Sequence, residues 1–269
     1  MKKFILLLFL LPVISSGQKI VDKENVFSQA ELQKLDSVFH QFYRHTNVSL
    51  LFYSTPDLDG YTTLEYVQIL KEDEKDLGIE KPPLHNNITI IMSKNDRKIN
   101  FINGHGVEWL VSDKTAKKII DHFIPFFMEH KFADGIEFGI ESYKEILGNY
   151  SWEVVEKTLP ELTKKDTGKI IKFYYKNPNY KAPAEDEYEY EEYFDEKYGV
   201  DIEDAPQFSK KYQLEIKETG KGYKLYFSKH MYDLYQTISK RPATTVYARL
   251  ADYKKGILEL IGIEELVEN

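Results

Sequence analysis

Residues 87–113 constrain the fold of this chain more than any other segment. An apolar run at residues 88–92 is followed by polar residues 93–97 and a second apolar run at residues 99–102. Two short apolar runs joined by a polar stretch predict two neighbouring β-strands. A helix is expected to begin soon afterwards, at Ser112.

Between the second predicted strand and that helix stand Gly104, His105 and Gly106, with Glu108 two residues later. A Gly-x-Gly at a strand end allows backbone to approach a ligand closely. We therefore predict that these three residues form a ligand loop, with Glu108 supplying charge beside it. His105 could donate to an anion or polarise a phosphate, although it is also consistent with an ordinary loop residue.

Helix and strand signals alternate through residues 18–148. Ser28 and Glu31 form a capping box before residues of helical spacing, and Thr62 with Glu65 forms a second one. Between and after these helices lie apolar runs with the length of buried strands. The order β-α-β-α-β-β-α-α predicts an α/β fold, a three-layer domain with a mixed four-stranded sheet between helices.

From residue 149 onward the pattern changes to short strands and turns. Residues 219–222, Thr-Gly-Lys-Gly, separate two apolar runs and predict a hairpin. We therefore expect residues 149–269 to form a smaller, β-rich α+β domain. Residues 185–204 are rich in acids and tyrosines. They predict a solvated surface loop, with a docking surface for a basic partner or weak calcium binding as the alternatives.

The first 17 residues have the features of a secretory signal peptide. Lys2 and Lys3 precede a short apolar run, and Ser15 and Gly17 are small residues suited to cleavage before Gln18. An N-terminal membrane anchor is the alternative, but the run is shorter than the roughly 20 residues that span a bilayer. We expect a periplasmic or secreted protein with no membrane span after cleavage.

Composition excludes several kinds of site. The formal net charge is −8, and the chain contains no cysteine. An acidic chain is a poor ligand for nucleic acid. The absence of cysteine excludes disulfides, thiolate metal sites and a lipid-anchored N-terminal cysteine.

Acidic residues near predicted strand ends are the candidate metal ligands. Ligands of α/β sheets bind at loops beyond strand ends, and carboxylates without cysteines suit calcium or magnesium better than zinc. The alternative is that these acids cap helices or pair with surface lysines. The predicted ligands are Asp22, Asp57, Asp59, Asp96 and Glu108.

Residues 20–147 also resemble a known family. The order of an apolar strand, Asn-Asp-Arg-Lys, a second strand and Gly-x-Gly-x-Glu is similar to that of the TPM-domain family, which includes a thylakoid-lumen phosphatase-like protein. The similarity extends to flanking residues, namely Val21, Asp22, Val26, Phe27, Ser28, Glu31, Leu32, Ile124, Pro125, Phe132 and Gly135. It implies the same three-layer fold and a divalent metal, often calcium, with Asp22 and Glu108 matching the recurrent acids best.

Three functions remain open from the sequence. The first is an exported TPM-domain protein that binds calcium or magnesium and acts through an unidentified envelope protein. The second, implied by the resemblance, is a metal-dependent acid phosphatase in which Asp22, Asp96 and Glu108 hold the metal. The third is a secreted structural adaptor whose acids are merely surface residues. No residue is assigned a catalytic role, because no nucleophile with an evident base stands out.

Overall fold

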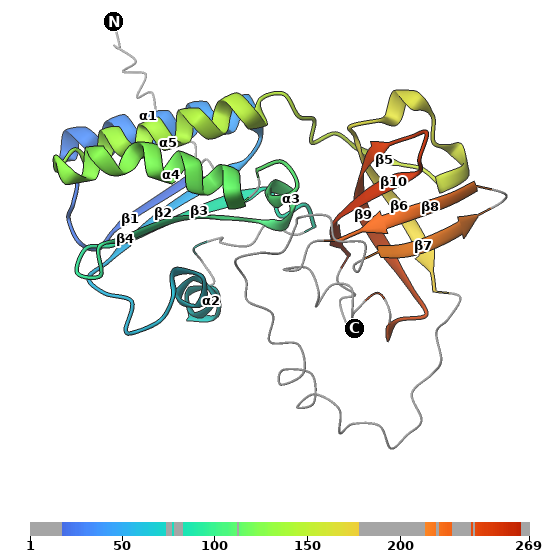
Figure 1. Ribbon diagram of the computed structural model, residues 1–269, viewed down its shortest axis with the longest axis horizontal. Coiled ribbons are helices and arrows are strands. Elements are labelled where there is room, and N and C mark those ends of the chain that lie inside the picture. The colour runs from blue at the N-terminus through green and yellow to red at the C-terminus, as the bar shows by residue number, and fades with distance from the viewer. Residues whose placement is uncertain are drawn as a thin grey trace, which may run out of the picture.

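The computed structural model describes residues 18–73, 77, 83–111, 113–177, 213–218, 221–227, 238 and 240–264. The predicted signal peptide at residues 1–17, the acidic segment 185–204, the hairpin turn at 219–220 and the helix start at Ser112 lie outside the described residues. The fold class expected from the sequence is confirmed. A four-stranded mixed sheet packs between helices and is followed by a second, β-rich region (Figure 1).

The first sheet has the strand order β1-β2-β3-β4. Its first three strands are parallel, and β4 runs antiparallel to β3. All seven residues of β2 and all seven of β3 are buried, as expected for central strands covered on both faces. The strands are β1 (Gln18–Asp22), β2 (Ser49–Thr55), β3 (Asn87–Ser93) and β4 (Lys98–Asn103).

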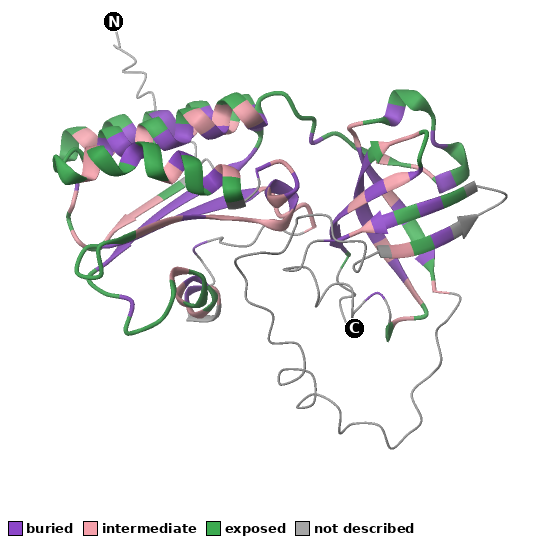
Figure 2. Ribbon diagram, viewed as in Figure 1, coloured by how far each residue is buried: buried purple, intermediate pink, exposed green. Residues whose placement is uncertain are grey.

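Helices cover both faces of this sheet. One face carries α1 (Gln29–Thr46), α4 (Asp113–Met128) and α5 (Phe132–Leu147), and the other carries α2 (Thr63–Asp73) (Figure 1). The buried residues of the three-helix layer face the sheet (Figure 2). The predicted capping box of α1 is present, with Glu31 N donating to Ser28 Oγ. Pro125 lies inside the last turn of α4, which ends three residues later.

The second sheet has the strand order β5-β6-β9-β10-β8-β7. Two 3-10 helices, η2 (Leu159–Glu161) and η3 (Lys164–Asp166), lie in the connection from β5 to β6. The strands are β5 (Val154–Glu156), β6 (Ile170–Lys176), β7 (Gln213–Glu218), β8 (Lys221–Tyr226), β9 (Ala243–Asp252) and β10 (Ile257–Ile263).

The two regions pack against each other through a short helix, α3 (His105–Glu108), and strand β10. The indole Nε1 of Trp109 donates to the backbone carbonyl of Leu260. A continuous cluster of buried apolar residues runs from the three-helix layer into the second sheet. The segment 148–153, where the sequence placed the domain boundary, connects α5 to β5.

Candidate functional site

Four of the five predicted metal ligands lie at one edge of the first sheet. Because β1, β2 and β3 are parallel, their carboxyl ends meet at the same edge. Asp22 is the last residue of β1. Asp57 and Asp59 follow β2, and Asp96 lies in the turn between β3 and β4. We call this the carboxylate edge.

Asp22 is already used to shape the backbone. Its Oδ1 accepts a hydrogen bond from Val26 N at 3.1 Å, and its Oδ2 accepts one from Phe27 N at 3.0 Å. The hydroxyl of Ser54 on β2 also donates to Oδ1, at 2.8 Å. Asp22 therefore holds the entry to α1 against the sheet, because both of its oxygens serve local hydrogen bonds.

Asp96 ties the two loops of the carboxylate edge together. Its Oδ2 accepts from Leu58 N and from Ser93 Oγ, both at 2.7 Å. These two bonds hold the pKa of the Asp96 carboxyl below its usual value, since they favour the charged form. The loop after β2 is thus fixed at Leu58, beside the two remaining acids.

Asp57 and Asp59 are exposed on that loop. Asp57 Oδ1 accepts from Asp59 N at 3.2 Å, and Asp59 has a left-handed backbone with φ of 51°. The pKa of Asp59 is raised, first by a side-chain hydrogen bond with Asp57, then by the charge of Asp57 and, to a smaller extent, by that of Asp96. Asp57 and Asp59 therefore favour sharing one proton.

Glu108 lies at the opposite edge of the sheet. The last residue of β4, Asn103, pairs with Ile88 at the beginning of β3, so the chain after β4 emerges where β3 starts. A seven-residue strand is about 23 Å long. One ion cannot contact both Asp22 and Glu108, so the structure does not bring these two predicted ligands together.

The predicted ligand loop forms the first turn of α3, and the backbone of residues 84–85 occupies the space beside its two glycines. A Cβ added at Gly104 would come within 3.0 Å of the carbonyl oxygen of His85, and one at Gly106 would crowd that of Leu84. His105 Nδ1 lies 3.4 Å from Glu108 Oε2, and its ring centroid is 5.4 Å from that of His85. The glycines here allow two backbone segments to pack closely.

The described acids do not form a ready-made metal centre. Nowhere in the described part of the chain do three or more His, Asp or Glu side chains lie close enough together to hold an ion. At the carboxylate edge, Asp57 and Asp59 would have to turn toward Asp96 to share one. Both side chains are exposed, so packing does not oppose that movement.

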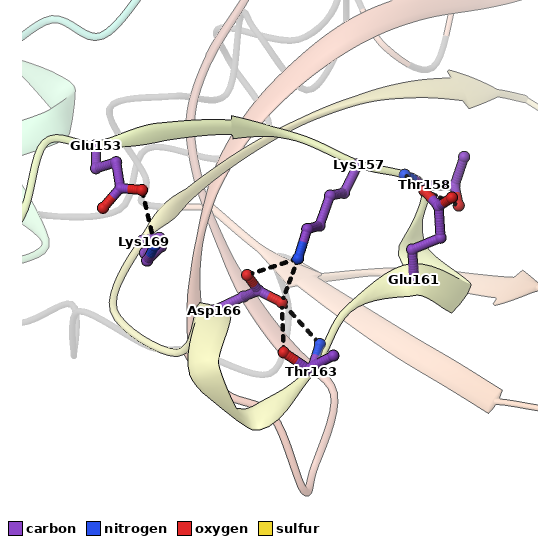
Figure 3. A network of polar contacts seen from close by, with 7 residues as sticks. All are labelled: Glu153, Lys157, Thr158, Glu161, Thr163, Asp166 and Lys169. Carbon is purple, nitrogen blue, oxygen red and sulfur yellow. Dashed lines mark hydrogen bonds and ion pairs between the residues drawn. The ribbon is translucent and has the colours of Figure 1, made fainter.

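A polar network in the second region was missed from the sequence (Figure 3). Asp166 is buried, and Lys157 Nζ contacts its two oxygens at 2.9 and 3.0 Å. Thr163 donates to Asp166 Oδ2 from its backbone N and its hydroxyl, both at 2.8 Å. Together with Lys157, these bonds lower the pKa of Asp166 to about 2. The Thr-x-x-Asp spacing of a capping box was the available signal.

Two further charged residues, Arg249 and Glu259, were missed because they lie within apolar strands. They are directly opposite each other on β9 and β10. Burial lowers the pKa of the Arg249 guanidinium and raises that of Glu259 to about 7. In the sequence, both look like the solvent-facing residues of half-buried strands.

Comparisons with solved structures find several that are similar to part of this chain. The structure resembles the N-terminal domain of a protein from P. gingivalis (TM-score 0.41, 16% identity, covering 48% of this chain and 80% of that one). It also resembles the BA42 protein of the psychrophilic bacterium Bizionia argentinensis (TM-score 0.40, 16% identity, 46% and 83%). A third similar structure is the N-terminal domain of a Corynebacterium glutamicum protein (TM-score 0.39, 8% identity, 55% and 90%).

A search of curated proteins found no match. Among the described residues, no helix is both long enough and apolar enough to cross a membrane. The model of the TPM domain family matches residues 20–146, the segment that forms the first sheet and its helices. Residues 20–146 of this chain are therefore a TPM domain.

Proposed function

We propose that this chain is an exported protein whose TPM domain binds calcium at the carboxylate edge and acts through protein interaction at the cell envelope. The candidate ligands are Asp57, Asp59 and Asp96. Glu108 is left out because it lies at the other edge of the sheet, and Asp22 because its oxygens hold the entry to α1.

The raised pKa of Asp59 is the observation that supports this proposal. It arises first from a side-chain hydrogen bond between protonated Asp59 and Asp57, and then from the negative charges of Asp57 and Asp96. A cation between Asp57 and Asp59 would take the place of that proton and offset the same charges. A cation would therefore stabilise the loop conformation in which these carboxylates lie close together.

The chemistry of this edge suits calcium. Calcium accepts six to eight oxygen ligands in flexible geometry, including carboxylates, backbone carbonyls and water, whereas magnesium requires near-ideal octahedral geometry. Asp57 and Asp59 lie on an exposed loop, which includes Gly60 with φ of 86°. Such a loop can adjust around a large cation more readily than it can form a strict octahedron.

Export and interaction are supported by the sequence and the architecture. Residues 1–17 have the pattern of a signal peptide, and the second sheet adds a surface beyond the TPM domain. Under this proposal, the second region provides specificity for an envelope partner, and the calcium site stabilises the loops at the carboxylate edge.

A calcium-dependent thermal shift tests the site. For a chain beginning at Gln18, calcium at about ten times its dissociation constant should contribute about 1.4 kcal/mol, or roughly 3–5 °C in Tm. Asp59→Asn should abolish this shift. Glu108→Gln is the matched control at the opposite edge and should retain it. No shift with millimolar calcium, or a shift lost in Glu108→Gln and kept in Asp59→Asn, would refute the proposal.

Phosphatase activity, which the resemblance implies, is tested on the same protein in a separate assay. The hydroxyl of Ser93 donates to the Asp96 carboxylate at this edge, but Ser93 is only 1% exposed. It is therefore poorly placed to attack a substrate. A generic phosphomonoester should not be hydrolysed between pH 4 and 8, with or without calcium or magnesium. Hydrolysis that Asp57→Asn and Asp59→Asn abolish would instead favour an enzyme.

A further inference from the structure

Arg249 on β9 is a buried cation with no counter-ion in contact with it among the described residues. The residue is 3% exposed. Its guanidinium nitrogens Nε, Nη1 and Nη2 have no hydrogen-bond partner among the described residues. Buried polar atoms are nearly always paired, so three unpaired donors on one side chain require an explanation.

Arginine cannot relieve this burial by losing its proton. The guanidinium remains charged in proteins and presents five N–H donors in a rigid plane. Desolvation lowers the pKa of Arg249, but an arginine begins so high that the charge persists. A group that stays charged while buried is stabilised most strongly by an anion that accepts hydrogen bonds from it.

Two aromatic rings from segment 148–153 lie against the guanidinium. Its Cζ lies over the ring of Trp152 at 5.3 Å from the centroid and over that of Tyr150 at 5.7 Å. Both distances fall within the range of cation–π attraction. The Trp152 indole N–H, itself buried, also has no hydrogen-bond partner within the described part of the chain. Unused donors from β9 and from segment 148–153 therefore lie together.

Glu259 does not fill the role of counter-ion. It lies directly opposite Arg249 on antiparallel β10, so both side chains are on the same face of the sheet. No ion pair within 4.0 Å joins these two described residues, although their charges interact. Because burial raises the pKa of Glu259 to about 7, the acid is largely protonated in mildly acidic solution. It can then donate a hydrogen bond instead of supplying a negative charge.

We propose that Arg249 and Trp152 form a binding site for one carboxylate group at the junction of the TPM domain and the second sheet. A carboxylate accepts two N–H bonds from a guanidinium in one plane, and its single charge is neutralised by one arginine. A phosphate dianion would leave a net negative charge beside Glu259. Tyr150, which is 43% exposed, lies over the guanidinium, so a ligand would reach Arg249 only if the Tyr150 ring moves aside.

This site is distinct from the carboxylate edge, and its proposal does not depend on calcium binding. The chain contains two tryptophans, so the indole N–H groups give two separate NMR signals. Trp109 donates to the carbonyl of Leu260 and serves as an internal control. Trp152→Phe removes one signal and so assigns both.

The experiment titrates the ¹⁵N-labelled chain from Gln18 onward with sodium acetate at constant ionic strength. The Trp152 signal should move saturably, with a dissociation constant on the order of 10 mM, while the Trp109 signal stays in place. Sodium chloride should have no effect, and inorganic phosphate should bind at least tenfold more weakly. An acetylated triglycine with a free carboxyl terminus should compete if the natural ligand is a peptide end, whereas its amide should not.

Two variants test the roles of Arg249 and Glu259 in acetate binding. Arg249→Lys should weaken acetate binding at least tenfold, because lysine cannot present two parallel N–H donors. Glu259→Gln should keep or tighten binding, because it removes the neighbouring acid. An unmoved Trp152 signal at 100 mM acetate in the unaltered protein would overturn the proposal. Tighter binding of phosphate than acetate, or an unchanged affinity in folded Arg249→Lys, would also overturn it.

Discussion

The two sheets of this protein place their charged residues differently. In the TPM domain the notable acids lie on exposed loops at one sheet edge, and their oxygens accept bonds from nearby backbone. In the second sheet an arginine and a glutamate lie on the strands themselves, largely removed from solvent. The acids of the first sheet therefore stay close to solvent, whereas burial makes the stability of the second sheet depend on the charge of Glu259.

The junction between these regions depends on close backbone packing, and it should give the largest effect. A Cβ at Gly262 on β10 would come within 3.0 Å of the carbonyl oxygen of Pro83, which belongs to the TPM domain. Gly262→Ala should therefore lower the free energy of unfolding by about 3 kcal/mol, as overpacking does in well-packed cores. Urea denaturation measures this change. Gly222→Ala on β8 is the control, because nothing lies within 4 Å of its added Cβ. Equal effects of the two substitutions would show that the junction is loosely packed.

The buried Asp166 should give the next largest effect. Asp166→Ala removes the contact with Lys157 and both bonds from Thr163, and we expect a loss of about 2 kcal/mol at pH 7. Because the folded-state pKa is lowered to about 2 from 3.8, this stabilisation is present above pH 4 and is lost as the pH falls toward 2. Denaturation at pH 7 and pH 2.5 measures it. Glu161→Gln, in the exposed capping box of η2, is the matched control and should have a smaller effect. A destabilisation by Asp166→Ala that is undiminished at pH 2.5 would contradict this account.

Glu259 should show the opposite pH dependence. Its pKa is raised to about 7 from 4.5, so its contribution to stability is present below pH 4.5 and is lost as the pH rises through 7. Glu259→Gln should therefore stabilise the protein by about 2 kcal/mol at pH 8 and change little at pH 5. Thermal unfolding of both proteins at the two pH values measures the difference. Parallel stability profiles would mean that Glu259 is charged in the folded protein throughout this range.

The sequence was sufficient for the first sheet because its signals are local. Apolar runs of strand length and the Ser28 capping box identify elements without reference to distant residues. The grouping of Asp22, Asp57, Asp59 and Asp96 at one edge followed from the expectation that ligands gather beyond strand ends. Glu108 was expected beside these acids, but β4 runs antiparallel to β3. The chain that follows β4 therefore lies at the edge where β3 begins.

Other features depend on contacts between residues far apart in the chain. Gly104 and Gly106 suggested a ligand, but residues 84–85 are what their backbone approaches. Arg249 stands in a strand of alternating pattern, where its face would ordinarily be exposed. Tyr150 and Trp152 lie against its guanidinium, and their positions depend on the path of segment 148–153 from α5 to β5. No local pattern in the sequence specifies that path.

The smallest predicted effects separate the acids of the carboxylate edge from one another. Asp22→Asn should lower the free energy of unfolding by about 1 kcal/mol, because a neutral amide accepts the N–H bonds of Val26 and Phe27 less strongly and places a donor where an acceptor was. Asp57→Asn should be neutral or slightly stabilising without calcium, because it removes a charge that repels Asp59. Urea denaturation in the presence of a chelator measures both substitutions. If Asp57→Asn were as destabilising as Asp22→Asn without calcium, Asp57 would be holding the fold together, and the division between a structural Asp22 and a cation-binding Asp57 would fail.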